Sequence, residues 1–284
     1  MSKQSSITIR FWGVRGCIAG QCASCVRYGG NTSCVSIDVG PDRVLVLDAG
    51  TGIRQLGKAL ADTSADIFVL LSHSHMDHIQ GFPFFLPIYQ PSRRIWVFPT
   101  LQDESMICSL LEQMDGAHLP VTPDDLPSKW QCISEEPMGF LREHDFCISR
   151  IPTNHPGEGY GYRIENHGRS VVYLTDNELD PPGEKATQFD EFVQFCRHTD
   201  VLIHDAQYLE KDMPHKHGWG HSLVSQACEL AMAAEARHLI LYHHDPDRTD
   251  DELDVVQQDA GAWFKERNAN IRCTVAFEGL TLDI

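Results

Sequence analysis

The most constraining feature of the sequence is an apolar run that ends abruptly in titratable side chains. The run DIFVLLSH (66–73) has the continuous apolar character of a strand buried on both faces. It ends in His73, and His75, Asp77 and His78 follow, so that four titratable groups lie within six positions. In an extended or tightly turned loop, residues two apart point the same way and can grip one cation. Imidazoles with carboxylates suit zinc, and also manganese or iron, so the sequence predicts a metal site here.

The rest of the chain alternates between strand-like and helix-like segments. Short β-branched runs bounded by Gly, Pro and Asp predict strands, and apolar residues at helical spacing predict helices. The predicted strands are 7–12, 34–39, 43–50, 66–73, 94–98, 146–151, 160–164, 170–175, 200–204, 238–243 and 272–277, and the predicted helices are 52–62, 101–114, 187–197, 222–236 and 250–267. The Pro- and Asp-rich stretch 115–130 is interpreted as a loop. We therefore predict an α/β protein, a four-layer αββα sandwich of two packed sheets covered by helices, forming a single domain over 1–284.

Charge and hydropathy limit the expected location and partners. No apolar run approaches the ~20 residues of a membrane helix, and the N-terminus has no apolar signal core, so we expect a cytoplasmic protein without a membrane partner. The formal net charge is -17, from 40 acidic and 23 basic side chains. Such a surface repels phosphate backbones unless a basic patch overrides it, and we find no such patch. We therefore expect a small anionic substrate and no large nucleic acid.

The stretch HSHMDH (73–78) resembles the H-x-H-x-D-H signature of the metallo-β-lactamase superfamily. The family pattern continues with a later histidine, a bridging aspartate and a final histidine, each at a strand end. The chain supplies His155 in IPTNHPG, Asp176 in VVYLTDNE, and His243 or His244 in LILYHHD. The alignment favours His243, and His244 would point to the other side of the strand. The resemblance extends from about residue 7 to the C-terminus and implies the metallo-β-lactamase fold.

The resemblance also implies two divalent metal ions, with zinc as the default and manganese or iron as alternatives. One ion would be held by His73, His75 and His155, the other by Asp77, His78 and His243, and Asp176 would bridge the pair. A metal-bridging hydroxide would then be the nucleophile of a hydrolysis. Asp77 could accept a proton from it, which would give Asp77 a catalytic role besides metal binding.

Residues 200–245 resemble the ribonuclease Z group of phosphodiesterases within this superfamily. In that group a His-Glu-Ala-Thr motif ends a strand, and a His-Ser or His-Thr motif opens a helix. The chain has His204-Asp205-Ala206-Gln207 and His221-Ser222 instead. The resemblance implies that His221 stabilises or protonates the leaving oxygen and that Asp205 orients it. Asp in place of Glu shortens the reach to His221 by one methylene.

Two further patterns concern the substrate. The ribonuclease Z group carries a long tRNA-binding arm between its third-motif histidine and the bridging aspartate, whereas here Asp176 is 21 positions after His155, enough for a hairpin. The stretches FWGVRG, RYGGNTSCVSI and LDAGTGIRQLG are similar to a bacterial subgroup related to cyclic-nucleotide phosphodiesterases. We therefore predict a dinuclear metal-dependent hydrolase of a small nucleotide-type phosphodiester, with a homodimer implied by resemblance only. The alternatives are a lactone or thioester hydrolase of the same fold and a metal-containing ligand sensor without turnover.

Overall fold

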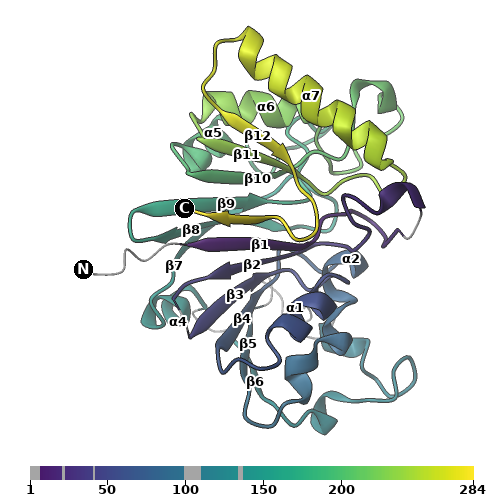
Figure 1. The fold of residues 1–284 in the computed structure, drawn as a ribbon, viewed down its shortest axis with the longest axis vertical. Coiled ribbons are helices and arrows are strands. Elements are labelled where there is room, and N and C mark those ends of the chain that lie inside the picture. The colour runs from purple at the N-terminus through teal and green to yellow at the C-terminus, as the bar shows by residue number, and fades with distance from the viewer. Residues whose placement is uncertain (1–6, 21–22, 41, 99–109, 134–136) are drawn as a thin grey trace. The chain divides into compact units, whose positions relative to one another are not determined.

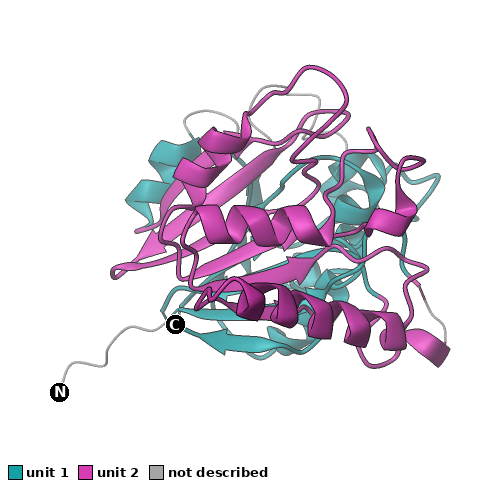
Figure 2. Cartoon of the chain, turned by 90° about the horizontal axis from the view of Figure 1, so that it is seen from above, with its two compact units in different colours: residues 1–19, 31–144, 278–284 teal, residues 20–30, 145–277 magenta. Residues whose placement is uncertain are grey.

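The structure is a computed structural model that describes residues 7–20, 23–40, 42–98, 110–133 and 137–284 (Figure 1). It divides into two compact units. Unit 1 contains residues 1–19, 31–144 and 278–284, and unit 2 contains residues 20–30 and 145–277 (Figure 2). Each unit has one sheet and a hydrophobic core of its own. The single domain over 1–284 stays a prediction.

Unit 1 is built around a mixed sheet in which β13 and β6 are the edge strands. Its strand order is β13 (Thr281–Asp283), β1 (Thr8–Gly13), β2 (Cys34–Asp38), β3 (Arg43–Leu47), β4 (Asp66–Leu70), β5 (Arg94–Phe98) and β6 (Lys129–Cys132). The pairs from β13 to β3 are antiparallel, and those from β3 to β6 are parallel. The parallel half matters for function, because β3 and β4 send the chain out at the same edge of the sheet.

Short helices complete unit 1. Among the described residues they are α1 (Ile53–Ala59), α2 (Met76–Ile79), α4 (Pro137–Glu143) and the 3-10 helices η2 (Phe82–Phe84), η3 (Leu86–Tyr89) and η4 (Pro123–Asp125). Helix α1 buries Ile53 and Leu56, three apart on one face, in the core that β3, β4 and β5 also line. Helix α1 also contacts η2 and η3, the segment that follows the candidate metal loop.

Unit 2 has the second sheet, in the order β12 (Arg272–Val275), β11 (His238–Tyr242), β10 (Val201–Asp205), β9 (Arg169–Leu174), β8 (Tyr160–Asn166) and β7 (Cys147–Pro152). Strands β9 to β12 are parallel, and β7 and β8 join antiparallel at the other side. Every residue of β10 and β11 is buried, as expected for parallel strands covered on both faces.

The described α-helices of unit 2 are α5 (Phe189–Cys196), α6 (Val224–Ala233) and α7 (Asp250–Glu266), and its described 3-10 helices are η1 (Ala23–Cys25) and η5 (Glu210–Asp212). Helix α6 contacts β10, β11 and the other two helices, and α7 contacts β12 (Figure 1). Helix α7 begins with a capping box in which Thr249 accepts from the Glu252 amide, so a sequence-encoded N-terminus sets its start.

Every predicted strand is present within a few residues, and so are the predicted helices at 52–62, 187–197, 222–236 and 250–267. Residues 101–109 of the predicted helix 101–114 lie outside the described residues. The loop predicted at 115–130 is partly wrong, because its last residues begin β6. Strand β6 alternates exposed and half-buried positions and has no apolar run, so its pairing with β5 depends on tertiary contact.

Candidate metal centre

The candidate ligands of unit 1 lie where β4 ends. Strands β3 and β4 are parallel, with Leu47 opposite Leu70, so the residues after both strands emerge at one edge of the sheet. The His73 ring lies 4.5 Å from the His75 ring and 4.2 Å from the His78 ring, measured between centroids. Helix α2 begins just after His75 and places Asp77 in its first turn, with the Asp77 Oδ2 3.2 Å from His78 Nε2. The four predicted residues of this stretch are therefore gathered within unit 1.

Asp48, which the sequence analysis did not single out, hydrogen-bonds to His78 in this group and to Ser72 before it. It follows β3 in a left-handed conformation, φ 61°, and is fully buried. Its carboxylate accepts from His78 Nδ1 at 2.8 Å, from the Ser72 amide at 2.6 Å and from the Ser72 hydroxyl at 2.8 Å. Gly50 lets the same loop approach α2, because a Cβ there would lie 2.2 Å from the Asp77 carbonyl oxygen. The left-handed φ of Asp48 is seen only in the structure, and a single aspartate after a predicted strand carries no signal of this role in the sequence.

The candidate residues of unit 2 lie at the carboxyl ends of four strands. His155 follows β7, Asp176 follows β9, Asp205 ends β10 and His243 follows β11. Strands β9, β10 and β11 are parallel, and β7 runs in the same direction through two antiparallel pairings, so these ends share one edge of the sheet. Asp176 and His243 have φ values of 46° and 58°, the same left-handed device as in unit 1.

Asp176 lies between two histidines. Its Oδ1 is 3.1 Å from His243 Nε2, and its Oδ2 is 3.6 Å from His155 Nε2. All three side chains are almost fully buried. One carboxylate oxygen thus faces each histidine, which is the arrangement that a bridging ligand requires.

His221 is held by Asp205. The Asp205 Oδ2 accepts from His221 Nδ1 at 2.7 Å, and the Asp205 Oδ1 accepts from the Ser222 amide at 3.1 Å. The shorter aspartate therefore reaches the histidine without difficulty. The His221 ring stacks on the His243 ring, with centroids 5.0 Å apart. The side chains of Asp205, His221 and His243 form one buried cluster in unit 2.

The donor sets of both units fit a divalent cation. The Nδ1 of His78 donates to Asp48, that of His155 to the Gly220 carbonyl at 3.0 Å, and that of His243 to Gln207 Oε1 at 2.9 Å. Each neutral imidazole then presents a bare Nε2 lone pair, and each Nε2 faces a carboxylate oxygen. An Nε2 lone pair and a carboxylate oxygen are both hydrogen-bond acceptors and repel each other. Their approach is favourable only when a metal cation or a proton lies between them. Outer hydrogen bonds of this kind are typical of histidines that bind metals.

The two remaining histidines named from the sequence have other roles in the structure. His244 Nε2 donates to the Ala276 carbonyl at 2.8 Å, so the ring turns away from Asp176. His204 lies inside the sheet, where its Nδ1 donates to the Asp205 carbonyl at 2.6 Å. Burial lowers the pKa of His204 and keeps this imidazole neutral.

Glu178 is a further residue that sequence reasoning missed. It is buried, and its two carboxylate oxygens accept from the Gly218 and Gly220 amides, each at 2.8 Å. The Gly220 carbonyl in turn accepts from His155, and His221 comes next in the chain. A Cβ on Gly220, which has φ 86°, would lie 2.2 Å from His155 Nδ1. Glu178 thus fixes the turn that contacts one candidate ligand and precedes the candidate acid.

Comparison with known proteins identifies the family. A family model described as a beta-lactamase superfamily domain matches residues 43–244, well over half of the chain. The chain belongs to this superfamily. Ribonuclease Z of Halalkalibacterium halodurans is 39% identical over 116 residues, which cover 36% of this chain and 38% of that protein. The chain thus aligns with little more than a third of the length of this relative, and with 34% of ribonuclease Z from Thermoplasma acidophilum.

Solved structures show the fold. The metallo-beta-lactamase fold protein YhfI from Bacillus subtilis matches with a TM-score of 0.66 and 19% identity, covering 98% of this chain and 100% of that one. Human tRNase Z, short form, matches with a TM-score of 0.64 and 18% identity, covering 97% and 98%. The predicted metallo-β-lactamase fold and the resemblance to ribonuclease Z are therefore confirmed. The predicted class, a metal-dependent hydrolase, agrees with the family and with the names of these relatives.

The expectation of no large nucleic acid partner is wrong. The relatives include proteins named ribonuclease Z and tRNase Z, whose names specify RNA and tRNA. Net charge misled the prediction because it averages over the whole surface, whereas a phosphate is bound by the few cations that lie next to it. The hairpin predicted between His155 and Asp176 is present as β8 and β9.

Among the residues that the structure describes, no helix is long and apolar enough to cross a membrane. The cytoplasmic location and the absence of a membrane partner stay predictions.

Proposed function

We propose that this chain is a metal-dependent phosphodiesterase that hydrolyses nucleotide-containing substrates, RNA included. The observation that supports it best is the buried pair of His221 and Asp205 beside His243. Hydrolysis of a phosphodiester expels an alkoxide, which needs a proton donor. The relatives named ribonuclease Z support the same reaction class.

The ligands that we propose follow the family resemblance and the geometry within each unit. Two divalent ions, zinc by default, would be held by His73, His75, Asp77 and His78 from unit 1 and by His155, Asp176 and His243 from unit 2. When bound, divalent metal ions lower the pKa of water and neutralise phosphoryl oxygens.

The protein's own residues then bind, orient and move protons. Asp77 accepts the proton of the attacking water, and the Cys17 amide, which donates to Asp77 Oδ2 at 2.7 Å, orients that carboxylate. His221 delivers a proton to the leaving oxygen from Nε2, because its Nδ1 is engaged by Asp205. Asp205 also favours the charged imidazolium that this step needs. The buried position of His221 keeps the proton donor away from bulk water.

The experiment that tests this proposal compares wild type with His221→Ala. The substrates are a chromogenic phosphodiester, 3′,5′-cyclic mononucleotides, cyclic dinucleotides, a precursor tRNA, a lactone and a thioester, each with and without chelator. We expect chelator-sensitive cleavage of phosphodiesters, with kcat reduced roughly 10²- to 10⁴-fold in the variant. Metal content, measured by mass spectrometry, is expected to stay that of wild type.

His167→Ala, in the exposed β8–β9 turn, is the matched control and is expected to behave as wild type. Unchanged phosphodiester turnover in His221→Ala at full metal occupancy would contradict the proposed role. Cleavage of lactone or thioester alone would replace the phosphodiesterase by the other hydrolase. Metal binding without any turnover would favour the ligand sensor.

A further inference from the structure

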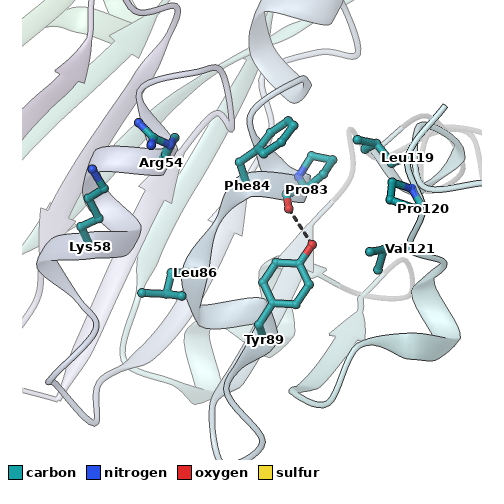
Figure 3. A pocket seen from close by; sticks show the side chains of 9 residues that line it. All are labelled: Arg54, Lys58, Pro83, Phe84, Leu86, Tyr89, Leu119, Pro120 and Val121. Atoms are coloured by element: carbon teal, nitrogen blue, oxygen red, sulfur yellow. Dashed lines mark hydrogen bonds between the residues drawn. The ribbon is translucent and has the colours of Figure 1, made fainter.

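A cavity of about 450 Å³ lies on unit 1 and contains none of the candidate ligands (Figure 3). It is lined by Arg54, Lys58, Pro83, Phe84, Leu86, Tyr89, Leu119, Pro120 and Val121. Figure 3 shows Arg54 and Lys58 to one side, on α1, residues 119–121 to the other, and the side chains of η2 and η3 between them. Its volume is within the range of ligand-binding cavities, about 300–1,000 Å³.

The periodicity of the 3-10 helices leaves apolar side chains exposed on the cavity wall. Phe82, Phe85 and Ile88 recur every third residue and are fully buried, as the three-residue turn of such a helix dictates. The outward positions between them would be polar on an ordinary surface. Instead, Phe84 and Tyr89 are 56% and 37% exposed. An exposed cluster of large apolar side chains commonly marks a binding site.

Tyr89 is held in place. Its hydroxyl donates to the Pro83 carbonyl oxygen at 2.7 Å, which ties η3 to η2 and fixes the ring against the cavity. Leu86, 41% exposed, extends the apolar wall toward Lys58 (Figure 3). The Tyr89 ring is therefore positioned at the cavity before any ligand binds.

The other wall is cationic. Arg54 and Lys58 are exposed and four residues apart on α1, so they project on the same face of the helix. Like charges at this spacing slightly disfavour the helix, and α1 has no acidic residue. None of the nine lining residues is acidic, and within the described part of the chain neither cation forms an ion pair. Two cations without a carboxylate are unexpected on a chain of net charge -17.

We propose that this cavity binds a nucleotide of a single-stranded nucleic acid substrate, outside the metal centre. A base stacks on the Phe84 and Tyr89 side, and Arg54 and Lys58 contact the phosphates. Aromatic rings beside a positive groove are the general means of binding single strands, because every base has a π-face. This inference rests on the proposed phosphodiesterase function and names its substrate class.

The position along the chain suits a substrate subsite. Helix α2 carries the last candidate ligand of the loop, His78, and η2 follows it directly. Phe84 is six positions after His78, so their Cα atoms are at most about 22 Å apart. A strand whose scissile phosphate lies at the metal loop therefore reaches the cavity within a few nucleotides.

Binding of a fluorescent single-stranded RNA 12-mer to the full chain tests the proposal. Fluorescence anisotropy is measured with chelator present, so that no cleavage occurs. We expect Phe84→Ala to weaken binding roughly 5- to 150-fold, and Phe84→Trp, but not Phe84→Leu, to preserve it, because stacking needs a ring. We expect Arg54→Ala/Lys58→Ala to reduce the slope of log Kd against log salt by about 1.4, the loss of two phosphate contacts.

Lys129→Ala/Arg142→Ala removes two exposed cations of unit 1 outside the cavity and serves as the matched control. RNA affinity that is unchanged in the cavity variants, or reduced equally in the control, would overturn the proposal. So would a change in sedimentation of the cavity variants with unchanged RNA affinity, because the cavity would then join two copies of the chain.

Kinetics separate this inference from the proposed function. In the active enzyme, the cavity variants are expected to raise KM for an RNA substrate while turnover of a small chromogenic phosphodiester stays that of wild type. If the cavity variants impaired hydrolysis of the RNA and of the small phosphodiester equally, the cavity would not be a separate subsite. If wild type cleaved neither, the phosphodiesterase proposal would fail, and the anisotropy measurement would still decide whether the cavity binds RNA.

Discussion

The two sets of candidate ligands differ in how the chain assembles them. In unit 1 the four residues from His73 to His78 lie within six consecutive positions after one strand. In unit 2 the three residues follow three different strands, and His155 and His243 are 88 positions apart (243 − 155). A short motif carries the first set, whereas the direction of the strands assembles the second. The first set therefore depends on a local turn and the second on the whole sheet.

The two sets also differ in their supports, meaning the groups that accept hydrogen bonds from the Nδ1 atoms of the candidate ligand histidines and the residues that fix those groups. In unit 1 a buried carboxylate, Asp48, holds the Nδ1 of His78. In unit 2 neutral oxygens of Gly220 and Gln207 accept from His155 and His243 at hydrogen-bond distance, and the Asp205 carboxylate lies farther from His243 Nδ1, at 3.6 Å. A carboxylate raises the basicity of the histidine that it holds more than an amide oxygen does. The supports in unit 1 are therefore expected to contribute more to metal affinity than those in unit 2.

Asp176→Asn should have the largest effect, because it removes the carboxylate that, in the described part of the chain, faces the Nε2 atoms of both His155 and His243. We expect metal content to fall and phosphodiester turnover to drop by about 10³-fold or more. The metal-free variant is expected to unfold at the same temperature as metal-free wild type or higher, because a buried charge is removed. Mass spectrometry and thermal melts measure the two effects. A variant that retained full metal content would show that Asp176 is not a ligand.

Asp48→Asn should have the next largest effect, a loss of metal affinity. It keeps the shape of the side chain but removes the charge beside His78, so metal affinity should fall roughly 10- to 100-fold. Ser72→Ala removes one other donor to Asp48, the Ser72 hydroxyl, and keeps the Ser72 amide; it is the control, with a smaller loss expected. Competition with a chromogenic chelator measures both affinities. Equal losses in the two variants would argue against a special role for the carboxylate.

Glu178→Gln tests the corresponding support in unit 2. The amide nitrogen of Gln would face one of the two backbone amides of Gly218 and Gly220, and the turn that holds His155 should loosen. We expect metal affinity to fall about tenfold, the lower end of such effects. Asp180→Asn, an exposed neighbour paired with Lys185, is the control. If Glu178→Gln lowered metal affinity as much as Asp48→Asn, the supporting residues of the two units would contribute equally to metal affinity.

The smallest expected effect is on the pH dependence of stability, through His238 at the opposite end of strand β11. His238 begins the strand whose end precedes His243, and its Nε2 lies 2.8 Å from the Thr274 hydroxyl. Burial, with a smaller contribution from Arg272, lowers the pKa of His238 from 6.5 to about 4. The unfolded chain then binds the proton more readily than the folded one. The stability that neutral His238 contributes is fully present above pH 6.5 and is lost as pH falls through 4.

His238→Gln should therefore flatten the decline of the urea midpoint between pH 6.5 and 4, relative to wild type. The variant His167→Gln, in the exposed turn between β8 and β9, is the control. Metal content should stay unchanged in both, since neither residue is near the ligand end of the sheet. Parallel pH profiles of wild type and His238→Gln would mean that this histidine does not carry the titration.

The sequence alone determined the parts of this protein that local patterns encode. The apolar run of β4 and the HSHMDH stretch that follows predicted both a buried strand and a metal site, and the family signature pointed to His155, Asp176 and His243. Periodicity located α7, because helix spacing depends on residues only a few positions apart, and the structure added its capping box.

Only the tertiary structure decided the parts that depend on distant residues. The supports Asp48 and Glu178 are single acidic residues in sequence, and they become visible only when parallel strands bring their ends to one edge. Strand β6 has no apolar pattern in the sequence, and its pairing with β5 is seen only in the structure. The cavity at Phe84 likewise requires α1 and η2 side by side. Local propensity acts over one turn or one strand, whereas pairing and burial are set by segments that are far apart in the chain.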